Sequence, residues 1–139
     1  MDELYQEIIL DHYRRPRNRD GCPGCAVSVH QDNPLCGDEI TLGLEVEDGT
    51  IVRVGYEGQG CSISTASASM MAEVVEGQSV SRARELSETV RRMMHGEAPG
   101  ADLGDLMALE GVARFPVRVK CALLAWTALN EALGKAGER

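Results

Sequence analysis

The stretch DEITLGLEVEDGTIVRVGYEGQGC, residues 38–61, decides the fold. Apolar residues occupy every second position from Ile40 to Val46, and charged or small residues fill the positions between them. This alternation predicts a strand with one buried face. Asp48-Gly49 is a sequence typical of a tight hairpin turn, and the alternation resumes from Val52 to Tyr56. We therefore expect an antiparallel hairpin at the centre of the fold.

Helical patterns lie on both sides of this hairpin. Apolar residues at helical spacing precede it, and several further segments with capping or stopping residues follow it. Val27 and Val29 supply a third strand. We expect an α+β fold: a small antiparallel three-stranded sheet with an N-terminal helix and a C-terminal helical layer. The expected helices are 3–14, one opened by Ser62 or Ser64 and ending near Gly77, one opened by Ser79 or Ser81 and closed by Gly96, a short turn at 106–109, and a long helix from Pro116.

Length and charge restrict the function. The 139 residues fit a single domain, 1–139, large enough to bury a core without disulfides. A net charge of −8 argues against nucleic acid as a partner. The N-terminus lacks the pattern of a signal peptide, and the apolar runs are too short to span a membrane, so we expect a cytoplasmic protein. In such a compartment the five cysteines are expected as free or metal-bound thiols.

Two of the cysteines and one carboxylate flank the hairpin. Cys36 and Asp38 are two residues apart at the entry to a strand, so both side chains point to one face and can converge on one metal. Cys61 follows Gly58-Gln59-Gly60 at the mouth of a helix. The glycines permit a close backbone approach, and the N-terminus of a helix favours a thiolate.

A third cysteine, Cys121, lies in the first turns of the last helix, and Arg118 lies one turn before it on the same face. Three sulfurs and one oxygen suit tetrahedral zinc, and thiolates are also the usual ligands of iron–sulfur clusters. The carboxylate is the more easily exchanged ligand and favours a site that opens. The alternative is that each cysteine only fills core, and spacing alone does not link cysteines scattered from 36 to 121.

Local sequence supplies the link that spacing does not. The chain resembles the IscU/NifU-N/SufU family of iron–sulfur cluster assembly proteins in four motifs, in order, over nearly its whole length. These motifs are Asn33–Asp38, Gly58–Ser64 followed by Ala66–Met71, Arg118–Trp126, and Leu4–Tyr13 with Pro16-Arg17-Asn18.

Two features resemble the SufU branch of that family. Lys120 stands immediately before the last cysteine, where IscU proteins usually have His, and the segment from about 77 to 115 is extended. The resemblance implies a zinc ion held by Cys36, Asp38, Cys61 and Cys121. It also implies that the protein accepts sulfur from a SufS-type cysteine desulfurase and works with downstream iron–sulfur assembly proteins. Cys36 is then expected to leave the zinc and take the persulfide, with Arg118 near the freed thiolate.

The sequence leaves other interpretations of this site open. The same ligands could instead hold iron or a transient [2Fe–2S] cluster that is delivered to apo-proteins. Whether the protein counts as an enzyme, a sulfurtransferase acting with the desulfurase, is undecided. Cys22-Pro23-Gly24-Cys25 departs from the family pattern and could be reduced thiols, a reversible disulfide or ligands to adventitious metal. For His12, His30 and His95 we expect structural roles, and for the two Met pairs, core filling.

Overall fold

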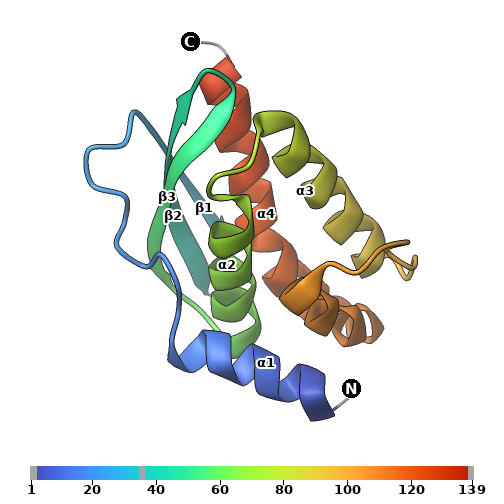
Figure 1. Ribbon diagram of the computed structural model, residues 1–139. Coiled ribbons are helices and arrows are strands. Elements are labelled where there is room, and N and C mark those ends of the chain that lie inside the picture. The colour runs from blue at the N-terminus through green and yellow to red at the C-terminus, as the bar shows by residue number, and fades with distance from the viewer. Residues whose placement is uncertain (1–2, 35–36, 138–139) are drawn as a thin grey trace.

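The computed structural model describes residues 3–34 and 37–137. The chain forms an N-terminal helix, three strands and then a series of helices, as the alternation and the helical spacing predict (Figure 1). The elements are α1 (Glu3–Arg14), β1 (Val27–Asn33), β2 (Asp38–Glu47), β3 (Thr50–Gln59), α2 (Ser62–Val75), α3 (Val80–Met94), the 3-10 helix η1 (Gly104–Arg114) and α4 (Pro116–Gly137).

The three strands form one antiparallel sheet in the order β1-β2-β3. The turn between β2 and β3 places both Asp48 and Gly49 at positive φ, 50° and 78°, which is the backbone of a tight hairpin turn. Leu42 pairs with Tyr56 and Leu44 with Val54, and all four side chains are buried on the same face. The predicted α+β class and three-stranded sheet are confirmed.

One prediction on β3 is wrong. The alternation was expected to turn Val52 inward, but its side chain is 39% exposed, whereas Ile51 is fully buried. The register shifts beside Glu45 and Val46, which pair with Arg53 and Ile51, so Val52 is an extra residue on β3. A bulge of this kind switches the face of every residue beyond it, and the sequence pattern carries no mark of it.

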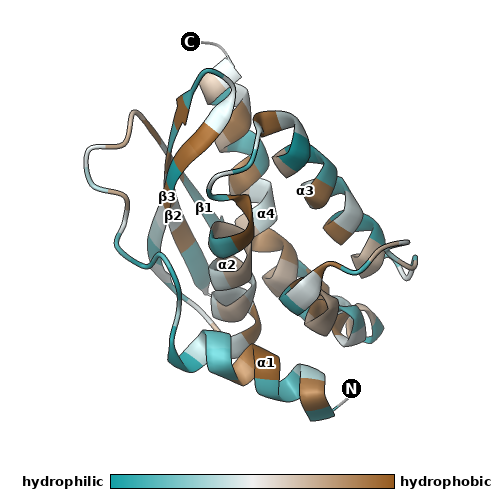
Figure 2. Ribbon diagram, viewed as in Figure 1, coloured by the Kyte–Doolittle hydropathy of each residue, from teal (hydrophilic) through white to brown (hydrophobic). Residues whose placement is uncertain are grey.

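The helices cover the face of the sheet on which the leucines lie. α4 packs on β1 and β2, α2 packs on β3, and α1 and η1 pack against α2 (Figure 1). α3 lies farther out on α4 and alternates between hydrophilic and hydrophobic residues along its length, as a surface helix does (Figure 2). Both Met pairs are buried in the core, as expected. The segment 77–115, extended in the sequence, forms α3 and η1, and η1 is longer than the short turn predicted at 106–109.

The opposite face of the sheet is covered by the connection between α1 and β1. Gly43 and Gly55 pair across β2 and β3, and Cys22 lies directly over them. Within the part of the chain that is described, no helix has both the length and the apolar character needed to cross a bilayer.

Candidate metal centre

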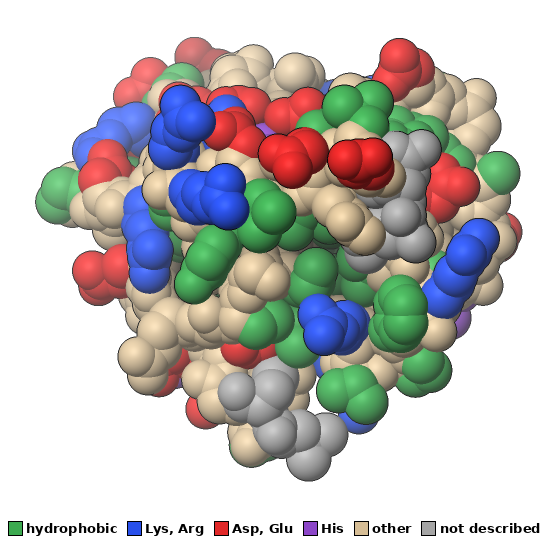
Figure 3. Space-filling view, turned by 90° about the horizontal axis from the view of Figure 1, so that it is seen from below, with side chains coloured by type: hydrophobic (Ala, Val, Ile, Leu, Met, Phe, Trp, Pro, Cys, Tyr) green, Lys and Arg blue, Asp and Glu red, His purple; other side chains and the backbone are tan. Residues whose placement is uncertain are grey.

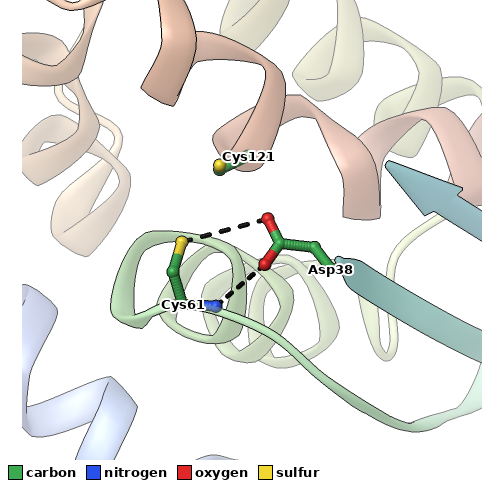
Figure 4. Close-up of side chains that lie close together, drawn as sticks. All are labelled: Asp38, Cys61 and Cys121. Carbon is green, nitrogen blue, oxygen red and sulfur yellow. Dashed lines mark hydrogen bonds between the residues drawn. The ribbon is translucent and has the colours of Figure 1, made fainter. Parts of the chain in front are cut away.

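Asp38 is the first residue of β2, and its carboxylate is buried, with 1% of the side chain exposed. Its Oδ1 accepts a hydrogen bond from the backbone N–H of Cys61 at 2.9 Å, and its Oδ2 lies 3.9 Å from the Sγ of Cys61 (Figure 4). A buried carboxylate needs such partners, because an unpaired one is strongly disfavoured away from water. The strand that begins at Asp38 therefore holds a carboxylate oxygen against the N-cap residue of α2.

Cys61 is the N-cap residue of α2, with the extended backbone that this position requires. Its Sγ accepts a hydrogen bond from the N–H of Ser64 at 3.5 Å, in the manner of a capping hydroxyl. This contact satisfies one of the backbone N–H groups that the first turn of a helix leaves without an intrahelical partner. The sequence pattern predicts that Ser62 or Ser64 begins this helix, whereas in the structure Cys61 is the N-cap residue. The Cys61 side chain is exposed.

Two glycines allow this close approach. A Cβ on Gly60 would lie 2.2 Å from the Oγ of Ser64 and 2.8 Å from the Oδ1 of Asp38. A Cβ on Gly58, whose φ is +144°, would lie 2.2 Å from the backbone oxygen of Glu39. A Cβ at Gly58 would collide with backbone, and a Cβ at Gly60 would displace the side chains of Ser64 or Asp38, so the prediction that these glycines permit a close backbone approach is confirmed.

Cys121 completes the cluster from above, on the second turn of α4 (Figure 4). Its side chain is 4% exposed, and its Sγ lies 3.8 Å from the carbonyl oxygen of Val117. One carboxylate oxygen of Asp38 and the sulfurs of Cys61 and Cys121 all lie within 4.8 Å of one another. Two sulfurs and an oxygen at this spacing fit a tetrahedral zinc ion, which takes Cys and Asp ligands.

Three further residues of the predicted site have different outcomes. Cys36, the fourth predicted ligand, lies outside the described residues. Arg118 is exposed, and no hydrogen bond or ion pair joins its guanidinium to any residue in 3–34 or 37–137. Lys120 is exposed as well. The roles of Cys36 and Arg118 stay predictions.

The cluster lies at the end of the molecule seen in Figure 3, where hydrophobic side chains mix with Lys and Arg and acidic side chains gather toward one rim. Phe115 and Val117, on either side of the start of α4, are 47% and 75% exposed. Val117 is also the residue whose carbonyl faces Cys121. Two apolar side chains are therefore left in water close to the cluster.

A second group of ligand-type side chains lies between α1, α2 and η1. His12 is fully buried, its Nδ1 lies 2.7 Å from the Oγ of Ser69, and its Nε2 lies 2.7 Å from the Oδ2 of Asp105. Glu73 lies near them and pairs with Arg17 at 3.3 Å. The expectation of a structural His12 is confirmed, but its partner Asp105, 93 residues away, was not foreseen. His30 and His95 likewise make ordinary hydrogen bonds, to Thr41 and to a backbone carbonyl.

The remaining two cysteines, Cys22 and Cys25, are joined by a disulfide. Of the three alternatives left open by the sequence, the structure therefore shows the disulfide. Cys22 is buried, and Cys25 is half-buried.

Comparison with known proteins agrees with the geometry. The family model of the NifU-like N-terminal domain matches residues 4–136. The chain is 42% identical over 137 residues to the zinc-dependent sulfurtransferase SufU of Bacillus subtilis, with 97% of this chain and 92% of the relative covered. It is 39% identical over 135 residues to the iron–sulfur cluster assembly scaffold protein IscU of Streptococcus pyogenes, with 96% and 84% covered.

Solved structures give the same result. A protein of Fervidobacterium islandicum, described as an iron–sulfur cluster assembly scaffold protein for the SUF system, superposes with a TM-score of 0.85 at 34% identity, covering 91% of this chain and 94% of that one. A NifU-like N-terminal domain from Brucella abortus, at 23% identity and a TM-score of 0.88, shares the fold, with 99% and 97% covered. The match over residues 4–136 and the identities above 30% establish that the chain belongs to the NifU-like N-terminal domain family.

Proposed function

We propose that this protein takes part in iron–sulfur cluster assembly as a zinc-dependent sulfur acceptor, receiving persulfide sulfur from a cysteine desulfurase. The observation that carries the proposal is the convergence of Asp38, Cys61 and Cys121 within 4.8 Å at one exposed end of the fold. The similarity to a zinc-dependent sulfurtransferase over 97% of the chain supports the choice of metal and of reaction.

The proposed ligands of the zinc are Cys36, Asp38, Cys61 and Cys121. Zinc bound there would keep its thiolate ligands deprotonated near neutral pH. The chain itself fixes the remaining geometry: the N–H of Cys61 holds the Asp38 carboxylate, and the N–H of Ser64 points at the Cys61 sulfur. These bonds orient two of the proposed ligands before any metal arrives.

The proposed acceptor of sulfur is Cys36. Its thiolate attacks the outer sulfur of the desulfurase persulfide, a new S–S bond forms on Cys36, and the old S–S bond breaks. The electron pair of the broken bond leaves on the desulfurase cysteine as a thiolate, so the exchange needs no oxidant or reductant. Arg118, exposed one turn before Cys121, is proposed to stabilise the persulfide anion on Cys36 by its positive charge.

The proposed partner is a SufS-type desulfurase, which would approach the end of the molecule shown in Figure 3. Exposed Phe115 and Val117 beside the cluster offer it an apolar contact. The proposal also places the protein in the cytoplasm, because a thiolate centre needs a reducing compartment. Downstream assembly proteins would take the sulfur on.

A second function is favoured by a separate observation, the 39% identity to an IscU scaffold protein. In that case the same ligands would assemble a transient [2Fe–2S] cluster and pass it to apo-proteins. Lys120 in place of the usual His, and the extended segment that forms α3 and η1, favour sulfur transfer. Protein purified without air and supplied with iron and sulfide separates the two: a stable coloured cluster would reverse this ranking.

The test of sulfur transfer uses the zinc-loaded protein, a SufS-type desulfurase and cysteine. We expect the peptide that contains Cys36 to gain one sulfur atom in mass, and desulfurase turnover to rise. Cys36→Ala should bind less metal, keep its helical content and lose both effects. The matched control is Ser28→Ala, an exposed position on β1, which should behave as the parent protein. Full stimulation by Cys36→Ala would exclude Cys36 as the acceptor.

A further inference from the structure

The Cys22–Cys25 disulfide closes a turn whose backbone brings the two cysteines together. The N–H of Cys25 donates to the carbonyl of Cys22 at 3.1 Å, with Pro23 and Gly24 at the two central positions and Gly24 at φ +82°. Pro followed by Gly at positive φ is the sequence of a type II turn. The two Cα atoms lie 5.6 Å apart, within the range a disulfide spans. The turn therefore suits both the dithiol and the disulfide.

The sheet has a place prepared for this turn. Gly43 and Gly55 face each other on β2 and β3. A Cβ on Gly43 would lie 2.9 Å from the Cβ of Cys22, and a Cβ on Gly55 would lie 2.5 Å from the backbone N of Cys22. Cys22 can pack this closely on the sheet only because both positions are glycine. The sequences of β2 and β3 therefore provide for the contact between the turn and the sheet.

Residues 18–22, which we call the strap, attach the turn to the edge of β3. The N–H of Tyr56 donates to the carbonyl of Asn18 at 3.0 Å, and the N–H of Gly21 donates to the carbonyl of Tyr56 at 3.1 Å. Cys22 has a φ of +50°, a left-handed conformation that disfavours a residue with a Cβ. The strap thus holds Cys22 in a strained backbone that the disulfide and these hydrogen bonds stabilise together.

The strap also contacts the end of β3 that leads to the metal centre. The Nη2 of Arg19 donates to the carbonyl of Gly58 at 2.6 Å, three residues before Cys61. Gly58 also lies close to β2, since a Cβ on it would lie 2.2 Å from the backbone oxygen of Glu39. Arg19 therefore anchors the end of β3 from the outer side, where the chain turns toward the candidate ligand Cys61.

The two groups of cysteines have opposite redox requirements. Cys61 and Cys121 can bind a metal only as thiolates, which calls for a reducing compartment; this step rests on the proposed function. In such a compartment a disulfide is transient, and is catalytic or redox-sensing. We propose that Cys22–Cys25 is a redox-active pair that exchanges with a thioredoxin-like dithiol protein, and that its state sets how firmly the strap holds the end of β3 that leads to Cys61.

The different exposure of the two cysteines indicates which sulfur the dithiol partner attacks first. A thiolate of the dithiol partner attacks the Sγ of Cys25, which is half-buried, rather than Cys22, which is 4% exposed. A mixed disulfide forms on Cys25, the bond between the two cysteines breaks, and Cys22 leaves with the electron pair as a thiolate and takes a proton. The second partner thiol then displaces Cys25, so two electrons and two protons pass to this protein and the partner becomes a disulfide.

The first arm of the test reads the redox chemistry without any sulfur transfer. Zinc-loaded protein is incubated with reduced thioredoxin, alkylated and mapped by mass spectrometry. We expect Cys22 and Cys25 to become alkylated together after reduction. Oxidised glutathione should restore the disulfide between them. A pair that never forms a disulfide in the folded protein, or that thioredoxin reduces only in denaturant, would overturn the proposal.

The second arm reads the coupling by amide hydrogen exchange in the oxidised and reduced forms. We expect peptides covering 18–25 and 56–61 to exchange about three- to tenfold faster after reduction, because the strap loosens, and the hairpin peptide 46–52 to stay unchanged. The double variant Cys22→Ser/Cys25→Ser should exchange like the reduced form and ignore thioredoxin. Arg19→Gln should speed exchange in 56–61 alone while the disulfide stays intact. Equal exchange in both redox forms at 56–61 would refute the coupling, whatever the outcome of the sulfur-transfer assay.

Discussion

Within residues 3–34 and 37–137, two groups of side chains bring metal-type ligand atoms within 4.8 Å of one another, and they differ in the kind of contacts those atoms make. Around His12, both ring nitrogens have partners at 2.7 Å, and Glu73 pairs with Arg17. Around Asp38, the sulfur of Cys61 lies 3.9 Å from Asp38 and 3.5 Å from the N–H of Ser64, and the sulfur of Cys121 lies 3.8 Å from the carbonyl of Val117. Sulfur makes weak hydrogen bonds, so a metal that replaced these particular contacts would remove little hydrogen-bond energy.

The difference shows that nearness of ligand atoms does not by itself make a site. The His12 group satisfies its own polar atoms and joins α1, α2 and η1, so it serves stability. The Asp38 group is placed by two closely packed glycines and by the N-terminus of α2, which bring one carboxylate oxygen and two sulfurs within 4.8 Å of one another. We expect mutations in the two groups to separate metal binding from stability.

The largest effect is expected for Cys121→Ala. Removing one of the proposed ligands should weaken zinc binding by at least about a hundredfold, more than the loss of a residue that only supports a ligand. Metal analysis after gel filtration, with chelator competition, measures this. His12→Ala is the matched comparison and should keep its zinc. The assignment of the two groups would be reversed if Cys121→Ala kept one equivalent of zinc with unchanged affinity, or if His12→Ala lost an equivalent of zinc.

The opposite pattern is expected for stability. His12→Ala leaves the buried hydroxyl of Ser69 with one partner fewer and opens a cavity between α1 and α2, so the free energy of unfolding should fall by about 3 kcal/mol. Urea unfolding followed by circular dichroism measures it. The control His30→Ala, at an exposed position on β1, should cost less than about 1 kcal/mol. A loss as small as that of the control would mean that the His12 bonds contribute little.

A smaller effect on the metal centre is expected for Gly60→Ala. The added Cβ would press on the Oγ of Ser64 and the Oδ1 of Asp38, so the carboxylate must move and zinc binding should weaken about tenfold. Gly134→Ala is the matched control, because nothing lies within 4 Å of its Cβ and it sits inside α4. The control should keep its zinc affinity and gain a little stability. Equal affinities in the two variants would show that Gly60 does not position the ligands.

The predictability of the two groups from sequence follows from the same difference. Asp38, Cys61 and Cys121 each lie in a local motif, and the ends of β2, α2 and α4 bring those motifs together. The pairing of His12 with Asp105 depends on how η1 packs on α1 across 93 residues, and neither residue has a local signal for it. Cys61 was not predicted as the N-cap for a different reason: cysteine is not among the usual capping residues.

The fold itself was largely predictable, because period-two and helical spacing are local. The strands, the Asp48-Gly49 turn and the start of α4 at Pro116 lie where those patterns place them. The exposed Val52 shows the limit: a single extra residue opposite Glu45 and Val46 reverses a face without changing composition. The face to which a residue points depends on how its strand pairs with the neighbouring strand. The sequence of one strand alone does not contain that information.

The smallest effect is expected for Tyr56→Phe, on the strand between the strap and α2. Burial raises the pKa of Tyr56 from 10.0 to about 12, and the positive charge of Arg19 and the hydroxyl of Ser69 partly offset this. The folded state favours the neutral phenol of Tyr56 over the phenolate, so this contribution to stability is complete below pH 10.0 and is lost as the pH rises through about 12.

The Tyr56 hydroxyl has no partner at full hydrogen-bond geometry among the described residues, so Tyr56→Phe should change stability at pH 7 by less than about 1 kcal/mol. It should remove the step near pH 12 from an absorbance titration at alkaline pH and flatten the fall in urea midpoint above pH 10.0. An unchanged titration would show that Tyr56 is not the tyrosine protected by burial.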